Sequence, residues 1–292
     1  MKIGIIGAGK MGYTLGKHFS LNQSDKIKLV WYYSKNITSA VDAAEFTNSN
    51  FFDSMEELVA ISDILFITVP DGEITNVVRL IKECSKEVDG KIICHTSGAM
   101  SSADMKEILP DAFMYSVHPI YAVNSKKDAY VNFGDAFITI EGDSEYINVL
   151  QELFLGLGHK TKLISPKDKV KYHSAAVFSS NLVIGLYHMA EELLKQCGFN
   201  EDEVSDAIKP LFINNAKKLY GSNCEEALTG PVERCDIETV EKHLNVLQNE
   251  HFDVYKLLSK ELIKIAEHKN KKNDYRELTE MLDFYNSFWL IL

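Results

Sequence analysis

The spacing of apolar residues divides the chain into two parts. Up to about residue 165, short runs rich in β-branched residues alternate with helical patterns. Six of these runs predict strands: KIGIIG, IKLVWYY, DILFITVP, KIICHTSG, FMYSVHP and AFITIEG. Several are apolar on both faces, as expected of strands that helices cover on both sides. The first part is therefore predicted to be an α/β domain with a doubly wound, mostly parallel sheet.

From residue 166 onward the strand signals stop and the apolar positions recur with helical spacing. Amphipathic helices are predicted over 167–198, 201–221, 237–250 and 252–269. Gly198 ends the first of them, where a glycine commonly closes a helix. We expect an α/β sheet domain over residues 1–165 and an all-α domain over residues 166–292.

Composition narrows the class of protein. A chain of 292 residues is long enough for two domains. Its net charge of −11 disfavours a general nucleic-acid surface, which needs a basic stripe to neutralise phosphates. The five cysteines form no CxxC pair, which is typical of reduced thiols, and the N-terminus lacks a signal-peptide pattern. The longest apolar stretch, 175–190, is interrupted by Asn181 and His188, so we expect a cytoplasmic protein with no membrane span.

A glycine motif follows the first predicted strand and opens a helix. Its first glycine permits a tight turn, its second lets backbone approach a pyrophosphate, and its third allows close helix–strand packing. The N-terminus of the helix then offers amide donors to phosphates. The context predicts a Rossmann dinucleotide site formed by GAGKMG, which is Gly7, Ala8, Gly9, Lys10, Met11 and Gly12. The alternative is a glycine-rich turn without a ligand.

The end of the second strand bears on the choice of cofactor. NAD sites usually place a carboxylate there to hold the ribose 2′-hydroxyl, but this chain has Ser34 and Lys35. A hydroxyl and a cation suit a 2′-phosphate, so NADP is favoured over NAD. The alternative is that Lys35 is only a solvated loop residue.

Two later strand ends belong to the same edge of the predicted sheet. Ligands of such sheets bind outside the carboxyl ends of the strands. We therefore expect both turns to flank the nicotinamide, with Val69, Pro70 and Asp71, in TVPD, binding the cofactor and Ser97, in HTSG, contacting the substrate. The alternative is ordinary turn chemistry, with Ser101 or Ser102 capping the next helix.

His173 and Asn181 interrupt the apolar segment KYHSAAVFSSN. On one continuous helix, positions 173, 177 and 181 share a face, so both side chains are predicted to point the same way. They either reach into a site or form a buried pair satisfied by backbone carbonyls. Lys171 is close in sequence but points elsewhere on such a helix.

Six motifs occur together and in order: GAGKMG, TVPD, HTSGA, VHPI, YHSAAVFSSN and LTGPVERCD. Through these motifs and their order the chain resembles, over nearly its whole length, the 6-phosphogluconate and β-hydroxyacid dehydrogenase-like reductases. The likeness is greatest to the second (PanG-type) class of ketopantoate reductase. The resemblance implies NADPH-dependent reduction of 2-dehydropantoate, a small 2-oxo acid, to pantoate in pantothenate biosynthesis. It also implies a homodimer formed through the helical domain.

The resemblance also suggests roles for polar residues. Related reductases present a lysine and an asparagine from the matching helix, and His173 stands here in place of that lysine. An imidazole can protonate the developing alkoxide, and Asn181 can orient the substrate. His118, in VHPI, is the remaining catalytic candidate, or else a loop histidine at the domain junction.

LTGPVERCD is the candidate site for the substrate carboxylate. Pro231 suits the first position of a helix, which places Thr229 near a helix N-terminus. Arg234 can bind a carboxylate with two hydrogen bonds, or can instead pair with Asp236 or Glu233 at the surface. Relatives usually carry glycine where Cys235 stands.

Two other functions remain open. An imine reductase of the pyrroline-5-carboxylate type keeps the same cofactor site but needs no histidine acid. A non-catalytic NADP-sensing protein binds cofactor without turnover. A metal site on His95, His118 and His173 is not expected, because no HxxxH or HExxH spacing supports it.

Overall fold

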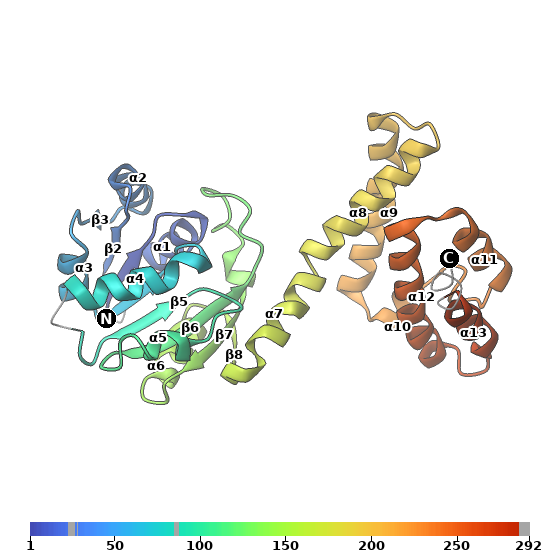
Figure 1. Ribbon diagram of the computed structural model, residues 1–292. Coiled ribbons are helices and arrows are strands. Elements are labelled where there is room, and N and C mark those ends of the chain that lie inside the picture. Colours follow the sequence, from blue (N-terminus) through green and yellow to red (C-terminus); the bar gives the residue numbers. More distant parts are fainter. Residues whose placement is uncertain (23–26, 28, 85–87, 286–292) are drawn as a thin grey trace. The chain divides into compact units, whose positions relative to one another are not determined.

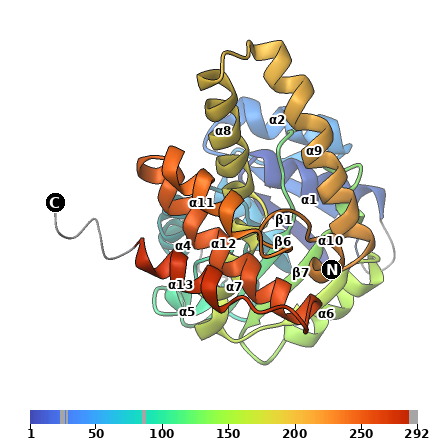
Figure 2. The same ribbon diagram turned by 90° about the vertical axis from the view of Figure 1, so that its right-hand side faces the viewer.

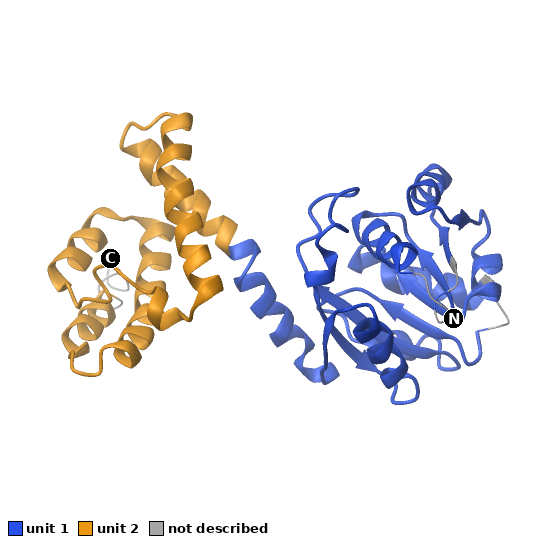
Figure 3. Cartoon of the chain, turned by 180° about the vertical axis from the view of Figure 1, so that it is seen from behind, with its two compact units in different colours: residues 1–182 blue, residues 183–292 orange. Residues whose placement is uncertain are grey.

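The computed structural model describes residues 1–22, 27, 29–84 and 88–285, which belong to two compact units, residues 1–182 and 183–292 (Figure 3). Among the described residues, all the strands belong to the first unit, and the second unit is helical. The last strand ends at Leu163, close to the predicted change of secondary structure at residue 166. The units divide later in the chain because helix α7 (Lys169–Phe178) contacts the sheet.

The first unit is built on one eight-stranded sheet with the order β3-β2-β1-β4-β5-β6-β7-β8. Neighbouring strands are parallel except β6 and β7, which confirms the predicted doubly wound, mostly parallel sheet. Strands β3 and β8 were not predicted. Strand β3 has only two residues, and strand β8, KTKL, is polar. The bounds are β1 Lys2–Ile6, β2 Leu29–Tyr33, β3 Asn50–Phe51, β4 Ile64–Ile67, β5 Ile92–His95, β6 Phe113–Ile120, β7 Phe137–Gly142 and β8 Lys160–Leu163.

Helices cover both faces of the sheet, as the apolar strands require (Figure 1). One core cluster joins the sheet to α1 (Lys10–Leu21), α2 (Ile37–Thr47) and α6 (Ile147–Gly156). A second cluster joins the other face to α3 (Met55–Ile61), α4 (Asp71–Cys84) and α5 (Ser102–Lys106). The chain crosses from one side of β1 to the other before β4, and ligands of doubly wound sheets bind at such a reversal of strand order.

Strand β6 extends beyond the carboxyl end of β5. His95, the last residue of β5, pairs with Ser116, whereas β6 continues to Ile120. Strand β7 pairs along this extension, and β8 pairs with the first part of β7. The extension therefore forms a wall beside the end of β5. A short 3₁₀ turn, Pro166–Asp168, then leads from β8 into α7.

The single helix predicted over 167–198 is two helices in the structure, and that prediction is wrong. Helix α7 ends at Phe178 and α8 (Asn181–Gln196) begins three residues later. The hydroxyls of Ser179 and Ser180 both donate to the carbonyl of Ala176, at 3.1 and 2.7 Å. Such side-chain hydrogen bonds compete with helical ones. The shared helical face inferred for His173 and Asn181 therefore does not carry across the break.

The second unit contains α9 (Glu201–Gly221), α10 (Cys224–Ala227), α11 (Ile237–Val246), α12 (Asn249–Lys269) and α13 (Arg276–Phe284), besides most of α8. Its apolar core lies among α11, α12 and α13. Helices α8 and α9 run antiparallel (Figures 1 and 2), and the rings of Tyr187 and Phe212 meet edge to face at 5.6 Å. Helix α8, described over its whole length, buries none of its side chains. None of the described helices is both long and apolar enough to cross a bilayer.

Pro231 does not begin a helix, contrary to prediction. Residues 231–235 form a turn, and α11 begins at Ile237 with Asp236 as its N-cap. The Asp236 carboxylate accepts from both the backbone N–H and the hydroxyl of Thr239, and these bonds fix the start of the helix further along the chain.

A buried histidine pair links α1 to the segment before β8. The Nδ1 of His159 donates to the carbonyl of Ala136 at 3.0 Å, so its Nε2 accepts from Nε2–H of His18 at 2.9 Å. Protonation of His159 leaves two N–H groups facing each other, and protonation of His18 places a charge on a buried ring. Burial, followed by the charge of His159, lowers the pKa of His18 to about 4, and burial also lowers the pKa of His159.

These shifts predict a loss of stability in mild acid. A histidine whose folded-state pKa is below its unfolded value of about 6.5 stabilises fully above that pH and progressively less toward its folded pKa. We expect the melting temperature to fall between pH 6.5 and 4. The fall should be smaller in His18→Gln and unchanged in His268→Gln, which alters an exposed histidine. Identical slopes for wild type and His18→Gln in differential scanning calorimetry would remove His18 as the cause.

Candidate functional site

The glycine motif forms a close turn between β1 and α1. Gly7 has a φ of +107°, which favours glycine, and Gly9 is the N-cap of α1. A Cβ on Gly12 would collide with the carbonyl oxygen of Gly7 and lie 2.8 Å from Oγ1 of Thr68. Ala8 is buried, Met11 packs against the core and Lys10 is exposed. The bare backbone and the free amides at this helix N-terminus fit a pyrophosphate.

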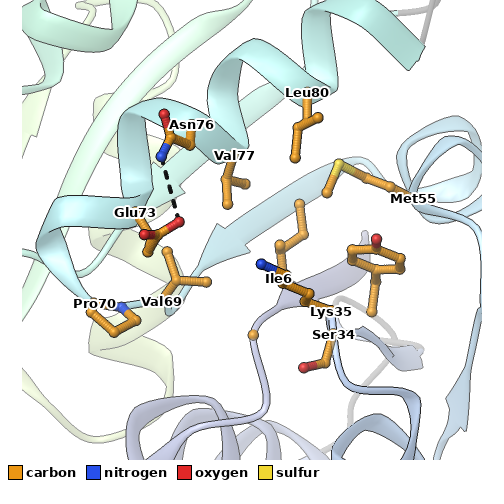
Figure 4. Close-up of a pocket in the computed structure, with 12 residues that line it drawn as sticks. Ile6, Ser34, Lys35, Met55, Val69, Pro70, Glu73, Asn76, Val77 and Leu80 are labelled. Atoms are coloured by element: carbon orange, nitrogen blue, oxygen red, sulfur yellow. Dashed lines mark hydrogen bonds between the residues drawn. The ribbon is translucent and has the colours of Figure 1, made fainter.

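A cavity of about 640 Å³ lies beside this turn (Figure 4). It brings together five predicted cofactor residues, namely Gly7, Ser34, Lys35, Val69 and Pro70. Its apolar wall comes from Met55 of α3 and from Val77 and Leu80 of α4. The lining also contains the carboxylate of Glu73, which comes from the first turn of α4. It does not come from the end of β2, where NAD sites usually place the carboxylate that holds the ribose. An apolar slot next to a hydroxyl and an ammonium group fits an adenosine with a phosphate on its ribose.

Ser97 and Asp71 connect the turns after β5 and β4. The Ser97 hydroxyl donates to Oδ2 of Asp71 at 2.6 Å and accepts from the backbone amides of Ala99 and Met100. Ser97 is 3% exposed. Three hydrogen bonds within the protein engage its oxygen, so in this structure Ser97 shapes the turn. Ser101 caps α5, as one of the two alternatives predicted.

Two imidazoles converge on Gly98 at the carboxyl end of β5. His118 comes from the extension of β6, His173 comes from α7, and their ring centroids are 5.6 Å apart. A Cβ on Gly98 would collide with Nδ1 of His173 and lie 2.9 Å from Nε2 of His118. The buried Nδ1 of His173 has no hydrogen-bond partner among the residues described. The structure thus places both histidines together, with two ring nitrogens beside a residue that has no side chain.

His118 is a neutral group at physiological pH. Burial, followed by the charges of Lys169 and His173, lowers its pKa to about 3. His95 lies close by and is fully buried, and burial with Lys169 lowers its pKa to about 3 as well. The backbone N–H of Ser97 donates to Nδ1 of His95, so the proton of this neutral ring lies on Nε2.

Lys169 is the main residue of the site that sequence reasoning missed. Its side chain is 1% exposed, and Nζ donates to the Ser97 carbonyl at 3.0 Å and to the Ser116 hydroxyl. It lies 3.9 Å from Oε1 of Glu141, which is equally buried. Burial lowers the pKa of Lys169 to about 8, although Glu141 and Asp71 oppose this shift. The available signal was its position four residues before His173, which puts both on one face of α7.

Glu141 is satisfied by hydrogen bonds as well as by the lysine. Its carboxylate accepts from the backbone N–H of Ser102 at 2.8 Å and from the Ser102 hydroxyl at 2.7 Å. His95, Ser116 and Glu141 are paired across β5, β6 and β7 at one level of the sheet. The Lys169 ammonium therefore anchors α7 to a row of polar groups at the strand ends.

The other predicted site residues lie further along the chain. Asn181 is exposed at the first position of α8, and its Oδ1 accepts from the Ser180 hydroxyl. Thr229 and Arg234 belong to the second unit, where both are exposed. Cys235 has a φ of +56°, in the left-handed region that favours glycine. Within the described ranges, no three His, Cys, Asp or Glu side chains gather as metal ligands would.

Comparison with known protein families matches both parts of the chain. A family model described as a Rossmann-like domain matches residues 1–119. Another, described as a domain of unknown function (DUF2520), matches residues 136–262. No curated protein matches the chain in sequence.

Solved structures with the same fold cover most of the chain. A protein from Bacteroides fragilis, provisionally named an NADP oxidoreductase, is 23% identical with a TM-score of 0.68, covering 90% of this chain and 98% of its own. The protein TM1727 from Thermotoga maritima is 23% identical with a TM-score of 0.72, covering 91% and 99%. A pyrroline carboxylate reductase from Plasmodium falciparum, solved with NADP bound, is 15% identical with a TM-score of 0.56, covering 91% and 98%. The chain therefore shares with these proteins a Rossmann-like domain followed by a helical region.

Proposed function

We propose that this protein is an NADPH-dependent reductase of a small 2-oxo acid, and that the acid is 2-dehydropantoate, which it converts to pantoate. The observation that carries the proposal is the convergence of His118 and His173 on Gly98, at the strand ends of a dinucleotide-binding fold. Reduction of a ketone leaves negative charge on its oxygen, and a proton donor within reach stabilises that charge. The sequence motifs supply the choice of substrate.

NADP fits the residues of this chain. The turn at Gly7 and the N-terminus of α1 suit the pyrophosphate, and the cavity beside Ser34 and Lys35 suits the phosphorylated adenosine. The similar structures include one named for NADP and one that contains it. When bound, NADPH supplies a hydride.

The protein's own groups then supply the proton and hold the substrate. In this proposal His173 gives its proton to the carbonyl oxygen, and the neutral His118 donates a hydrogen bond to the same atom. Asn181 orients the substrate, while Thr229 and Arg234 hold its carboxylate. The support for these last three roles is residue chemistry together with the sequence resemblance.

A second candidate is reduction of a cyclic imine. The likeness to a pyrroline carboxylate reductase favours it. An iminium already carries its proton, so such a reaction gives the two imidazoles no proton to deliver. We place it second because a neutral His118 and the His173 Nδ1, which has no partner among the described residues, support a role in donating to a carbonyl oxygen.

We also propose that the protein is a homodimer. The support is the number of exposed large apolar side chains on α8, on α9 and in the turn between them, which are 39–97% exposed. Large exposed apolar patches mark protein interaction sites, and we infer that these side chains contribute to one. The exposed set includes Leu182, Ile184, Phe199, Leu211, Phe212, Ile213, Leu219 and Tyr220. Sedimentation velocity tests this, since a monomer at micromolar concentration would contradict it.

The function is tested by the initial rate of cofactor oxidation on a panel of substrates. We expect turnover with NADPH and 2-dehydropantoate, slower turnover with NADH, and little with pyrroline-5-carboxylate. Equal rates with both cofactors would overturn the role given to Ser34 and Lys35 alone. Turnover only on the imine would establish the second candidate. Tight NADPH binding without turnover on any carbonyl or imine would indicate a cofactor-sensing protein.

A further inference from the structure

Tyr172, the neighbour of His173 on α7, makes contacts that the proposed reaction has not used. Its hydroxyl is hydrogen-bonded to Nδ1 of His118, and the two rings meet edge to face with centroids 5.6 Å apart. The hydroxyl of Thr139, on β7, lies 2.9 Å from the same phenolic oxygen and 3.2 Å from the carbonyl oxygen of His118. Thr139 is 3% exposed and Tyr172 is half-buried. Three polar groups from β6, β7 and α7 thus form one short chain of hydrogen bonds.

The order of donors in this chain fixes where the protons lie. The Thr139 hydroxyl has a single hydrogen, and the shorter of its two contacts directs that hydrogen to the phenolic oxygen. The phenol also has a single hydrogen, which then stays free to donate. With the Thr139 oxygen acting as donor, the phenolic hydrogen goes to Nδ1 of His118. The Nδ1 atom therefore carries no hydrogen, and the neutral ring must carry its hydrogen on Nε2.

We propose that Tyr172, supported by Thr139, is a positioning residue that fixes His118 as the tautomer with its proton on Nε2, directed at Gly98 beside His173. The role given to this proton rests on the proposed function, because a carbonyl oxygen bound next to Gly98 needs a donor there. The tautomer itself does not depend on it. Without the phenol, the proton of His118 can move to Nδ1, and the ring then offers only a lone pair at the strand ends.

The burial of His118 supports this assignment. With its pKa lowered to about 3, first by burial and then by Lys169 and His173, the ring is neutral and has one N–H to place. A neutral imidazole can stabilise a developing oxyanion by hydrogen bonding without giving up its proton. His118 would then act as a fixed donor, while His173, whose Nδ1 has no partner in the described part of the chain, delivers the proton.

The test is long-range ¹H–¹⁵N NMR on the cofactor-free, full-length protein labelled with ¹⁵N-histidine at pH 7. The spectrum distinguishes protonated from unprotonated ring nitrogens, and the signals of His118 are identified by their loss in His118→Gln. We expect Nδ1 unprotonated and Nε2 protonated in the wild type. Tyr172→Phe should shift the population toward the other tautomer, and Thr139→Val should do so in part. A wild-type ring protonated on Nδ1, or a tautomer unchanged in Tyr172→Phe, would overturn the proposal.

The second unit provides a matched control. There the hydroxyl of Tyr255 lies 2.8 Å from Nδ1 of His243, which is another partly buried tyrosine–histidine pair. Tyr255→Phe should change the signals of His243 and leave those of His118 as they are. If Tyr172→Phe lowers the yield of folded protein, Thr139→Val and the conservative Thr139→Ser still decide the matter. Thr139→Ser keeps the donor and should restore the wild-type tautomer, which a purely structural role for Thr139 does not require.

Kinetics separates this inference from the proposed function. We expect Tyr172→Phe to lower kcat about tenfold with little change in KM, as for loss of one oriented hydrogen bond in the transition state. Tyr255→Phe should leave kcat unchanged. Absence of any reductase activity in the wild type would remove the proposed function while the NMR result stood by itself. Activity that is equal in wild type and Tyr172→Phe, with an altered tautomer, would show that the proton on Nε2 is not used.

Discussion

Replacing His173 with alanine should lower kcat/KM for NADPH-dependent carbonyl reduction by at least about 100-fold, the lower range for loss of a positioned general acid. The affinity for NADPH should stay within about threefold of the wild type, because the cavity and the glycine turn contain no atom of His173. Stopped-flow rates with the best substrate of the panel, together with fluorescence titration of NADPH, measure the two quantities.

The control is His268→Ala, which removes an exposed histidine from α12. It should leave both quantities unchanged. If His173→Ala keeps a rate close to that of the wild type, the proton comes from another group. His118→Gln would then be the next variant to measure, since its Nε2 approaches the same glycine.

Replacing Lys169 with alanine should reduce the free energy of unfolding by about 3–5 kcal/mol, the usual cost of removing one partner of a buried ion pair. The carboxylate of Glu141, which is 1% exposed, would lose its compensating charge. The Ser97 carbonyl and the Ser116 hydroxyl would also lose a donor. Urea denaturation followed by circular dichroism measures the change.

The matched control is Lys171→Ala, on the same helix but exposed, which should change stability by less than about 0.5 kcal/mol. A double variant, Lys169→Met with Glu141→Gln, removes both charges and keeps most of the volume. We expect it to be more stable than Lys169→Met alone. If the double variant is the less stable of the two, the pair is not the source of the effect, and Lys169 acts through its hydrogen bonds.

The sheet domain was predictable because its strands are apolar and its first turn is rich in glycine. KIGIIG and DILFITVP form central strands, whose burial leaves a clear pattern in the sequence. KTKL forms an edge strand with alternating exposure, and its polar composition gives no such pattern. The break between α7 and α8 was missed because two serine hydroxyls decide it against a helical pattern that continues on both sides.

The candidate site was predictable where one segment determines it and not where several meet. Ser34 and Lys35 follow a strand, so their place at the cavity could be inferred from the strand itself. Glu141 lies 28 positions before Lys169, and no periodicity connects them, so their contact depends on the register of β6 with β7. The contacts of Tyr172 and Thr139 with each other and with His118 could not be predicted for the same reason. They depend on the extension of β6 past β5, which brings the three residues together.

The order of these residues along the chain also separates cofactor binding from the histidine cluster at Gly98. The residues that line the cofactor cavity all lie between positions 6 and 80, whereas Gly98, His118, Thr139, Tyr172 and His173 all come later. The two sets occupy consecutive stretches of the chain and share no residue. Mutation or recombination in the first stretch can therefore alter which dinucleotide is accepted without touching the imidazoles. Selection for a new substrate can act on the later stretch while the nucleotide pocket is inherited intact.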